Sequence, residues 1–429
     1  MNEIVGALII ILAGIALARG IDVRFVLFIA GISLGLASGD VFAIFNEFQK
    51  SMGEGKTIAP ICASMGYAFL LRMTGCDKAM VHYIMSPIQK LSWFLLPGSC
   101  FVGLLTNIAI PSQTAAAAAV GPILIPILTA AGFHPLIAAS ALVLGSSGGG
   151  DLFNPGEPEV VSIQVGTGAP LPEVMNTLAQ YELIAFTIAV TVFIFIAYLR
   201  PPTKVIEYGA HEQEDVQHPT LLKAIMPPLP ILTLILVRPG NHFFDPILSV
   251  YPQGLPVAHA MVFFGFLLIL FNTKRISALT NEFFNGLGFG YAQVISLIIA
   301  ANCFIAGLEG IGFMKSIIGF ILHAGPFAHV IGSLSVWAMA IISGSGTAPS
   351  VAFSNGVLPS MSAIDINNAI DLGALGALGS AFGRTMSPAA AVMIFAASLI
   401  GVSPLEIVKR TAIPLIVGLA ITILVSIIF

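Results

Sequence analysis

The sequence predicts an all-α polytopic membrane protein made of two related halves. Of its 429 residues, 57% are hydrophobic and 9% are charged, and the mean hydropathy is +0.98. Apolar runs of about 17 to 20 residues, long enough to span a bilayer, recur from end to end. One long polar stretch, PPTKVIEYGAHEQEDVQHPT, interrupts them. We therefore expect membrane repeats at 1–200 and 224–429, joined by a linker at 201–223.

The second observation is an internal repeat. TNIAIPSQTAAAAAVGPILIPIL at 106–128 aligns with the segment around SGSGTAP at 343–349, at a constant offset of 233 residues. An offset of 237 relates TGCDKAMVHYI at 74–84 to IGFMKSIIGFI at 311–321. An internal repeat of this kind is typical of transporters with a site between two-fold related halves. The identical pairs at the 233 offset are Ser112 and Ser345, Thr114 and Thr347, Pro126 and Pro359, Gly150 and Gly383, Pro155 and Pro388, Gly168 and Gly401, and Glu173 and Glu406.

The apolar runs predict the same order of elements in each half. The first half is expected to contain helices near 3–19, 22–38 and 57–74, an amphipathic stretch at 77–89, a hairpin at 91–131 centred on PSQT, a helix from 134 broken at GSSGGGDLFNPGEPE, and a span at 181–199. The second half is expected to contain spans near 224–238, 258–273 and 290–312, a hairpin at 326–361 centred on SGSGT, a broken helix from 364, and a span at 408–429. If the hairpins are re-entrant, each half crosses the bilayer five times. The second repeat is then inverted relative to the first.

Basic residues predict the orientation of these spans. With both termini outside, twelve basic residues face the cytoplasm and four face outward, which fits the positive-inside rule. The inward set is Arg19, Arg24, Arg72, Lys78, Lys90, Arg200, Lys204, Lys223, Lys274, Arg275, Lys409 and Arg410, and the outward set is Lys50, Lys56, Arg238 and Lys315. The linker is therefore expected to be cytoplasmic.

The two hairpin tips are candidate binding surfaces. Non-helical backbone at membrane depth persists only where it faces protein or a wet cavity. Gly344 and Gly346 permit a sharp turn, and Pro349 suits the start of the next helix. Helix N-termini following each tip would direct positive dipole ends to the membrane midplane, which favours an anion. The alternative is a polar loop at the membrane surface. The predicted substrate-binding residues of the tips are Ser112, Gln113, Thr114, Ser345, Gly346 and Thr347.

Arg384 is the strongest single candidate for a functional residue. It lies in GRTMSP, between the apolar runs LGALGALGSAF and AAAVMIFAASLIG, where a charge costs about 3 kcal/mol on insertion scales. Its guanidinium can bind a carboxylate through two parallel hydrogen bonds and does not lose its proton. Thr385 and Ser387 beside it are included in the predicted substrate site. The alternative role is structural, with Arg384 paired to Asp371 or to a backbone carbonyl.

The equivalent segment of the first half, GGGDLFNPGEPEVV, carries acids instead. Asp151 aligns with Arg384 at the 233 offset, and Asn154-Pro155 aligns with Ser387-Pro388. Oxygen ligands of this kind hold sodium or relay protons inside membrane proteins. The predicted cation-binding residues are Asp151, Asn154, Glu157 and Glu159, with Na⁺ or H⁺ as the possible coupling ion. The alternative for Glu157 and Glu159 is a water-exposed loop.

Several other kinds of site are not supported by the sequence. The four cysteines show no C-x-x-C spacing and the eight histidines no H-E-x-x-H spacing, so neither a disulfide framework nor a metal site is expected. GSSGG at 145–149 lacks the strand that a nucleophile elbow requires. GISLG at 31–35 and GSAFG at 379–383 indicate helix packing faces. We expect no enzyme activity, no cofactor and no nucleic-acid partner.

The C-terminal half resembles a known family. SGSGTAPSVAF, LGSAFGRTMSPAAAVMIFAA and SPLEIVKRTAIPLIVGL are similar to the DcuC-type anaerobic four-carbon dicarboxylate transporters of the ion transporter superfamily. The resemblance is most specific around Arg384, Thr385, Ser387 and Pro388. It implies transport of fumarate, malate or succinate across the inner membrane, by uptake, exchange or efflux. The tips are similar to the Ser-Asn-Thr tips of related elevator-type carriers, which often form homodimers. The resemblance places a carboxylate at Glu159, whereas Asp151 and Glu157 are additional.

The sequence thus favours an ion-coupled secondary transporter of small organic anions that works by alternating access, as a symporter or an antiporter. Arg384 would bind a substrate carboxylate, the tips would supply hydroxyls and amides, and Asp151 would hold a cation. The main alternative is a sodium/proton antiporter with no organic substrate, in which Arg384 and Asp151 form a structural pair. Two further hypotheses are a channel and a membrane-embedded enzyme.

Overall fold

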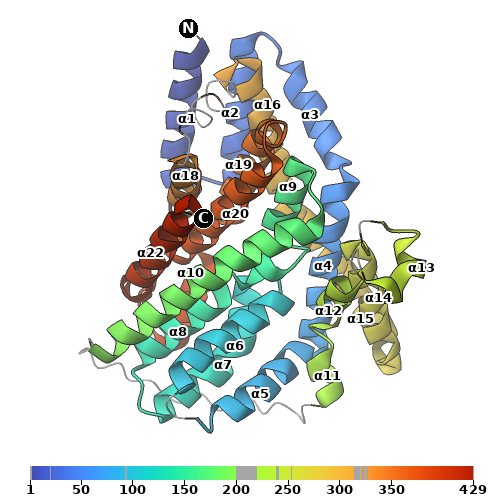
Figure 1. Cartoon of the computed structure of the whole chain (residues 1–429), viewed down its shortest axis with the longest axis vertical. Coiled ribbons are helices and arrows are strands. Elements are labelled where there is room, and N and C mark those ends of the chain that lie inside the picture. Colours follow the sequence, from blue (N-terminus) through green and yellow to red (C-terminus); the bar gives the residue numbers. More distant parts are fainter. Residues whose placement is uncertain are drawn as a thin grey trace.

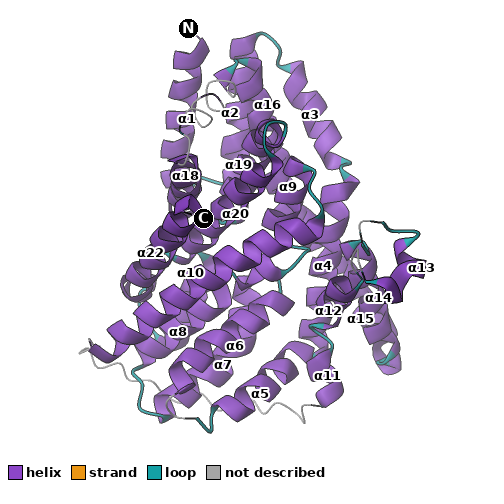
Figure 2. Ribbon diagram, viewed as in Figure 1, coloured by secondary structure: helices purple, strands orange, loops and turns teal. Residues whose placement is uncertain are grey.

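The computed structural model describes residues 2–19, 21–91, 94–199, 220–237, 241–252, 254–313, 319, 324 and 327–428. Within these ranges the chain consists of helices joined by short turns, without a β-strand (Figures 1 and 2). A helix pairs its backbone N–H and C=O groups within one segment, which an apolar surrounding requires. The all-helical class predicted from the sequence is confirmed.

The first half begins with the five helices α1 to α5, which are followed by a hairpin, a broken helix and a long helix. The hairpin is α6 and α7, and the broken helix is α8, η2 and α9 (Figure 1). In order, the elements are α1 (Asn2–Ala18), α2 (Val23–Ser38), α3 (Phe42–Met52), α4 (Gly55–Thr74), α5 (Cys76–Ile88), α6 (Leu95–Ala109), α7 (Gln113–Ala130), α8 (Pro135–Ser147), the 3₁₀-helix η2 (Gly150–Phe153), α9 (Pro158–Thr167) and α10 (Leu171–Leu199).

The second half ends in a corresponding arrangement, with a hairpin of α18 and α19, a broken helix of α20 and α21, and the long α22. The elements are α11 (Leu221–Ile225), α12 (Leu229–Leu236), η3 (His242–Phe244), α13 (Asp245–Leu248), α14 (Val257–Leu270), η4 (Thr273–Arg275), α15 (Ile276–Gly290), the π-helical η5 (Tyr291–Ile295), α16 (Ser296–Gly310), α18 (Phe327–Ser343), α19 (Thr347–Ser362), α20 (Ile366–Thr385), α21 (Ala391–Ile400) and α22 (Pro404–Ile428).

The helix bounds follow the offset found in the sequence. Both ends of α9 and α21 lie 233 residues apart, and so do the first residues of α10 and α22. Gly168 and Gly401, also 233 apart, cap α9 and α21 with φ angles of 70° and 68°. Such positive angles are accessible to glycine at little cost, so the same sequence signal ends both helices. The repeat in sequence is therefore also a repeat of local structure.

Some predicted bounds were wrong. Helix α3 was not expected, and α10 begins ten residues before the predicted span at 181–199. The predicted span at 290–312 continues a helix that begins at Ile276 and passes through η5. Polar residues in LPEVMNTLAQ and in ISALTNEFFNG lower the local hydropathy and conceal these turns, which tertiary packing stabilises. Residues 201–219 of the predicted linker, and most of the segment at 311–321, lie outside the described residues.

Glycines bring several helices into backbone contact. A Cβ atom added at Gly379 or Gly383 of α20 would lie 2.5 and 2.4 Å from carbonyl oxygens of α18. A Cβ added at Gly31 of α2 would lie 2.7 Å from the carbonyl oxygen of Cys303 in α16. Only glycine permits such an approach. The interpretation of GSAFG and GISLG as packing faces is confirmed.

A short chain of polar side chains joins the second hairpin to the surrounding helices. Asn355 of α19 donates from Nδ2 to Oδ1 of Asn302 in α16 at 2.7 Å. Asn302 in turn donates to Oγ of Ser51 in α3 at 3.1 Å. These residues line a polar cavity of about 260 Å³, together with Lys50 and Glu309. The contact between hairpin and neighbouring helices is thus specified by hydrogen bonds as well as by shape.

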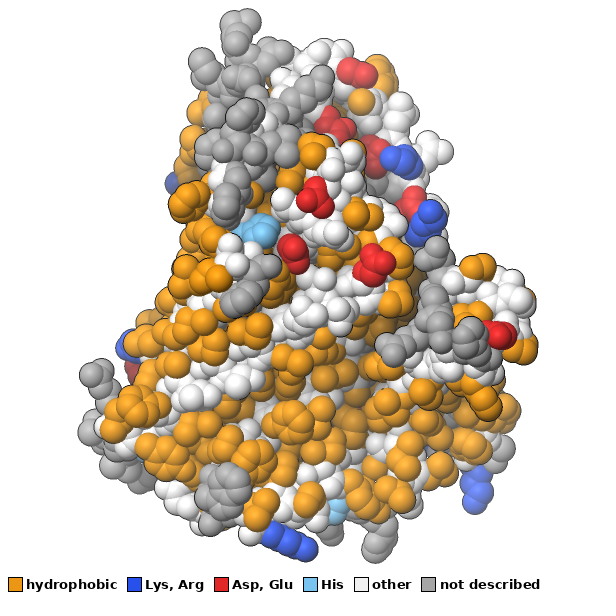
Figure 3. Space-filling model, in the orientation of Figure 1, with side chains coloured by type: hydrophobic (Ala, Val, Ile, Leu, Met, Phe, Trp, Pro, Cys, Tyr) orange, Lys and Arg blue, Asp and Glu red, His pale blue; other side chains and the backbone are white. Residues whose placement is uncertain are grey.

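The surface of the molecule is that of a membrane protein. In the part of the chain that the structure describes, five helical stretches are long and apolar enough to cross a bilayer, namely 113–130, 135–167, 171–199, 276–310 and 404–428. In Figure 3, hydrophobic side chains cover most of the lower part of the visible face, while acidic and basic side chains gather toward the upper right. Exposed apolar area of this extent is stable in contact with lipid. The polytopic membrane class is thereby supported.

Candidate functional site

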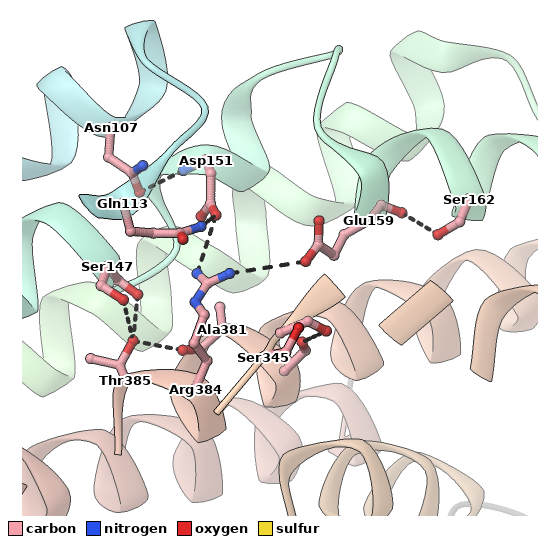
Figure 4. Close-up of polar contacts among 12 residues, drawn as sticks. Asn107, Gln113, Ser147, Asp151, Glu159, Ser162, Ser345, Ala381, Arg384 and Thr385 are labelled. Carbon is pink, nitrogen blue, oxygen red and sulfur yellow. Dashed lines mark hydrogen bonds and ion pairs between the residues drawn. The ribbon is translucent and has the colours of Figure 1, made fainter. Parts of the chain in front are cut away.

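The side chain of Arg384 is buried at the point where the two halves of the chain meet (Figure 4). It projects from the last turn of α20 and is 6% exposed. Its Nη2 donates to Oδ2 of Asp151 at 3.1 Å, and its Nη1 lies 4.0 Å from Oε1 of Glu159. Asp151 belongs to η2 and Glu159 to α9, so the guanidinium lies against the break in the first-half helix. The residues that the sequence singled out for charge are therefore brought together.

The PSQT tip contacts this centre through Gln113. The chain is extended at Ile110 and Ser112, and the Oγ of Ser112 accepts a hydrogen bond from the backbone of Ala115 at 3.4 Å, which caps α7. One residue later, Nε2 of Gln113 donates to Oδ2 of Asp151. Thr114 follows in the first turn and is half-buried. The tip therefore presents an amide to the carboxylate that Arg384 also contacts.

The SGSGT tip approaches the same centre from the second half. Gly344 has a φ of +67°, which provides the sharp turn, and the Oγ of Ser343 donates to the carbonyl of Ser345. Gly346 has an ordinary helical φ, but a Cβ added there would lie 2.7 Å from Nη1 of Arg384. Gly346 is thus required for close approach, not for backbone conformation. Thr347 begins α19 and is half-buried.

The break in the first-half helix is held by amide side chains. Oδ1 of Asn107 accepts a hydrogen bond from the backbone N–H of Asp151 at 3.0 Å. Asn154 donates from Nδ2 to the carbonyl of Ile108 at 2.9 Å, and its Oδ1 accepts from the backbone of Gly156. Both ends of the Asn154 amide are thus used to fasten the break. Its predicted role in cation binding stays a prediction.

Thr385 and Ser387 serve mainly in contacts within the protein. The Thr385 hydroxyl lies 2.8 Å from Oγ and 2.5 Å from the carbonyl of Ser147 on α8, and 2.7 Å from the carbonyl of Ala381 (Figure 4). Ser387 is buried, and its Oγ accepts from the backbone of Ala389 at 3.4 Å. These bonds fix the end of α20 against the first half. A substrate-binding role for either residue stays a prediction.

Acidic groups outnumber basic groups in this region. Asp151, Glu157, Glu159 and Glu182 are all buried around Arg384. Six of their carboxylate oxygens have no hydrogen-bond partner within the described residues: Asp151 Oδ1, Glu157 Oε2, and both oxygens of Glu159 and of Glu182. Buried polar atoms are nearly always paired in proteins, so unpaired ones indicate a site for something the protein binds. The alternative of a water-exposed loop does not hold for Glu157 and Glu159, since both side chains are buried.

Glu182 was not predicted as a site residue from the sequence. It lies more than two turns inside α10 and is 1% exposed, and a Cβ added at Gly149 would lie 2.2 Å from its Oε2. A lone acid within AQYELIAFTIAV is a signal for function in its own right. Because the predicted span began at 181, Glu182 fell at its end instead of its interior.

Asp371 bonds to a tyrosine and not to Arg384. Its carboxylate accepts a hydrogen bond from the hydroxyl of Tyr181 at 3.0 Å, so the ion pair of Arg384 is formed with Asp151 instead. The four cysteines are free and buried, as simple packing residues would be. In the described part of the chain, no three His, Cys, Asp or Glu side chains are placed to hold a metal ion.

Comparisons with known proteins identify the family of the chain. Residues 7–429 match the family described as DcuC, C4-dicarboxylate anaerobic carrier. The chain is 25% identical to the anaerobic C4-dicarboxylate transporter DcuC of Escherichia coli, over 91% of this chain and 84% of that protein. It is 26% identical to a probable anaerobic C4-dicarboxylate transporter DcuC of Vibrio cholerae, over 90% and 86% of the two chains. A putative uncharacterized transporter of Haemophilus influenzae is 30% identical, over 61% and 95%. The match covers nearly the whole chain, so this protein is a transporter, not an enzyme, and belongs to the DcuC family of C4-dicarboxylate anaerobic carriers.

Proposed function

We propose that the protein is an ion-coupled secondary transporter of four-carbon dicarboxylates such as fumarate, malate and succinate, located in the inner membrane. The observation that carries the proposal is the position of Arg384. It is a permanently charged donor, buried between two hairpin tips, and it faces two carboxylates at 3.1 and 4.0 Å. In this proposal, a substrate carboxylate competes with Asp151 and Glu159 for the donors of the guanidinium. The names of the relatives support the same class of substrate.

Charge provides the argument for ion coupling. Three buried carboxyl groups, those of Asp151, Glu157 and Glu159, act on one guanidinium, so the centre is already rich in acidic groups before a substrate arrives. A dianion adds two more negative charges in a region of low dielectric, where like charges repel strongly. Binding is therefore favourable only if protons or cations neutralise some of the acids. The unpaired oxygens of Asp151, Glu157 and Glu159 are the proposed places for them.

The repeated architecture supports an alternating-access mechanism. Each half supplies a hairpin, a broken helix and a long helix at an offset of 233 residues, and the two sets converge on Arg384. In our proposal the two repeats are inverted, the hairpin and broken-helix elements move together as an elevator, and the remaining helices form a scaffold that dimerises. The centre is closed in this conformation, since the side chains of Arg384 and Asp151 are 6% and 1% exposed. Substrate access then requires a conformational change.

A second candidate function is favoured by one observation. The Arg384–Asp151 ion pair is formed, as expected for a sodium/proton antiporter in which this pair is structural. Such a protein would exchange cations at Glu157 and Glu159 without an organic substrate.

Uptake of labelled succinate by proteoliposomes separates the two functions. We expect saturable uptake that fumarate and malate inhibit, that a monocarboxylate does not inhibit, and that an inward Na⁺ or H⁺ gradient stimulates. Succinate-independent Na⁺/H⁺ exchange without succinate uptake would establish the antiporter instead. Conductance that fails to saturate would indicate a channel.

A further inference from the structure

Glu182 differs from Asp151 and Glu159 because it forms no ion pair with a basic group among the described residues. Its carboxyl group is 1% exposed, and neither oxygen has a hydrogen-bond partner among the described residues. It lies inside α10, a 29-residue helix whose apolar sequence can span the bilayer. An ionised carboxylate in this setting would be highly unfavourable, whereas a protonated one costs little more than any buried polar group. We propose that Glu182 binds a transported proton, at a position separate from the Arg384 ion pair.

The surroundings of Glu182 are consistent with a proton and not with a larger cation. A Cβ at Gly149 would touch both carboxylate oxygens, at 2.2 and 2.5 Å, so the backbone of the break between α8 and η2 lies directly against the carboxyl group. Gly149 itself has a φ of +107°, which only glycine adopts readily. A sodium ion requires several oxygen ligands around it. Glu182 is 1% exposed and neither of its oxygens is hydrogen-bonded to another polar group among the described residues, so such ligands are not found at its carboxyl group.

The charged groups that act on Glu182 come from two of the elements packed against α10. They are Asp151 of η2 and Arg384 of α20. Helices α6 and α8 contain no ionisable side chain other than the thiol of Cys100, and α9 contributes Glu159, whose nearest basic group is Arg384. Helix α22 packs through Gly418, where an added Cβ would lie 2.7 Å from the carbonyl of Ala185. The basic residues of α22, Lys409 and Arg410, lie more than two turns earlier.

The repeat supplies a comparison for this position. The residue 233 positions after Glu182 is Leu415, which is also buried, at 1% exposure. The long helix of the second half therefore fills the equivalent place with a hydrocarbon side chain. A carboxyl group at 182 is not needed for packing, and its presence at a desolvation cost indicates a function.

The first test is infrared spectroscopy of the purified protein in lipid nanodiscs. A protonated carboxyl group absorbs separately from an ionised one. We expect Glu182→Gln to remove part of the protonated-carboxyl band at neutral pH. Glu173→Gln, which alters an exposed acid on the same helix, should leave this band unchanged. An unaltered band in Glu182→Gln would show that Glu182 is ionised or bound to a metal cation, and would overturn the proposal. This measurement requires no substrate, so its outcome is independent of the proposed dicarboxylate transport.

The second test rests on the proposed function and measures coupling. A pH gradient of one unit supports about tenfold substrate accumulation for each proton carried, since one unit corresponds to about 1.36 kcal/mol. We expect succinate accumulation under such a gradient to fall about tenfold in Glu182→Gln, while exchange across a membrane without a gradient persists. Glu182→Leu introduces the side chain found at position 415 and serves as a second variant in case Glu182→Gln does not fold. We expect the same tenfold loss of accumulation in Glu182→Leu. Accumulation equal to wild type in both variants would overturn the role of Glu182. Absence of succinate transport in the wild type would instead contradict the proposed function.

Discussion

The two halves of the chain form the contact between hairpin tip and broken helix in opposite ways. In the first half, the tip carries a long side chain, Gln113, and the broken helix carries a short acid, Asp151. In the second half, the tip residue at the 233 offset is Gly346, and the broken helix carries the long Arg384. In one copy the tip reaches to the helix, and in the other the helix reaches to the tip. One backbone plan can therefore hold opposite charges, provided that the side-chain lengths are exchanged together.

The comparison also shows an imbalance. The counterparts of Asp151, Glu157, Glu159 and Glu182 are Arg384, Ala390, Val392 and Leu415, so none of these four buried acids has an acidic counterpart in the second half. The repeat provides a symmetric frame, while the chemistry is divided between the halves. In our proposal, the first half binds the coupling ions and the second half binds the substrate anion.

The largest effect is expected when Arg384 is replaced, because the residues from both halves meet at its side chain. Arg384→Ala leaves Asp151 and Glu159 buried without their partner, and we expect a loss of about 3 to 5 kcal/mol in the free energy of unfolding. Arg384→Lys keeps the charge but loses the planar pair of donors, so folding should survive while dicarboxylate binding falls severely. Melting temperature and succinate affinity, measured on the same purified variants, distinguish the effects. Normal binding by Arg384→Lys would remove Arg384 from the substrate site.

A substitution at the second tip tests whether a short residue is needed there because the side chain of Arg384 is long. Gly346→Ala places a methyl group 2.7 Å from Nη1 of Arg384 in a closed site, and we expect a loss of about 1 to 3 kcal/mol in stability. Gly288→Ala is the matched control, because its added Cβ meets nothing within 4 Å. Thermal unfolding of both variants in the same lipid provides the measurement. Equal melting temperatures would mean that position 346 and the side chain of Arg384 are not in tight steric contact.

A smaller effect is expected at the hydroxyls of the tips. Thr347→Val keeps the shape of the side chain and removes its hydroxyl, so succinate binding should weaken by about 1 kcal/mol, the net contribution of a typical hydrogen bond. Thr114→Val in the other tip should do the same if the substrate lies between them. Calorimetric titration with succinate measures both. Affinity unchanged in the two variants would place the hydroxyls outside the site.

The smallest effect on stability is expected at Asp151. In Asp151→Asn, the amide oxygen can still accept from Arg384 and Gln113, so stability should change by less than about 1 kcal/mol. The dependence of uptake on sodium or pH should nevertheless become flatter, because the amide cannot bind a proton or an ion in the same way. Uptake assayed over a series of sodium concentrations and pH values tests this. A wild-type response would exclude Asp151 from coupling.

Much of this arrangement could be predicted from the sequence, because an internal repeat and a charged residue inside an apolar run can both be recognised there. The 233-residue offset predicted which segments correspond, and an arginine in an apolar run marked the centre. Contacts across the fold could not be predicted, since nothing local to Arg384 indicates that Glu159 lies 4.0 Å away. Helix α3 and the early turns of α10 were missed because polar residues concealed helices that packing stabilises. Because α10 was predicted to begin at 181, Glu182 was placed at a helix end and was not recognised as a buried acid.

The hydrogen bond between Asn355 and Asn302 has a consequence for the speed of any sliding motion. One turn to either side of Asn355 on α19 lie Val351 and Pro359, and neither side chain can donate or accept a hydrogen bond. A shift of α19 along its axis by one turn would remove the hydrogen bond that Oδ1 of Asn302 accepts from Asn355. In the proposed alternating-access mechanism, breaking this hydrogen bond would add to the free-energy barrier for movement of the hairpin.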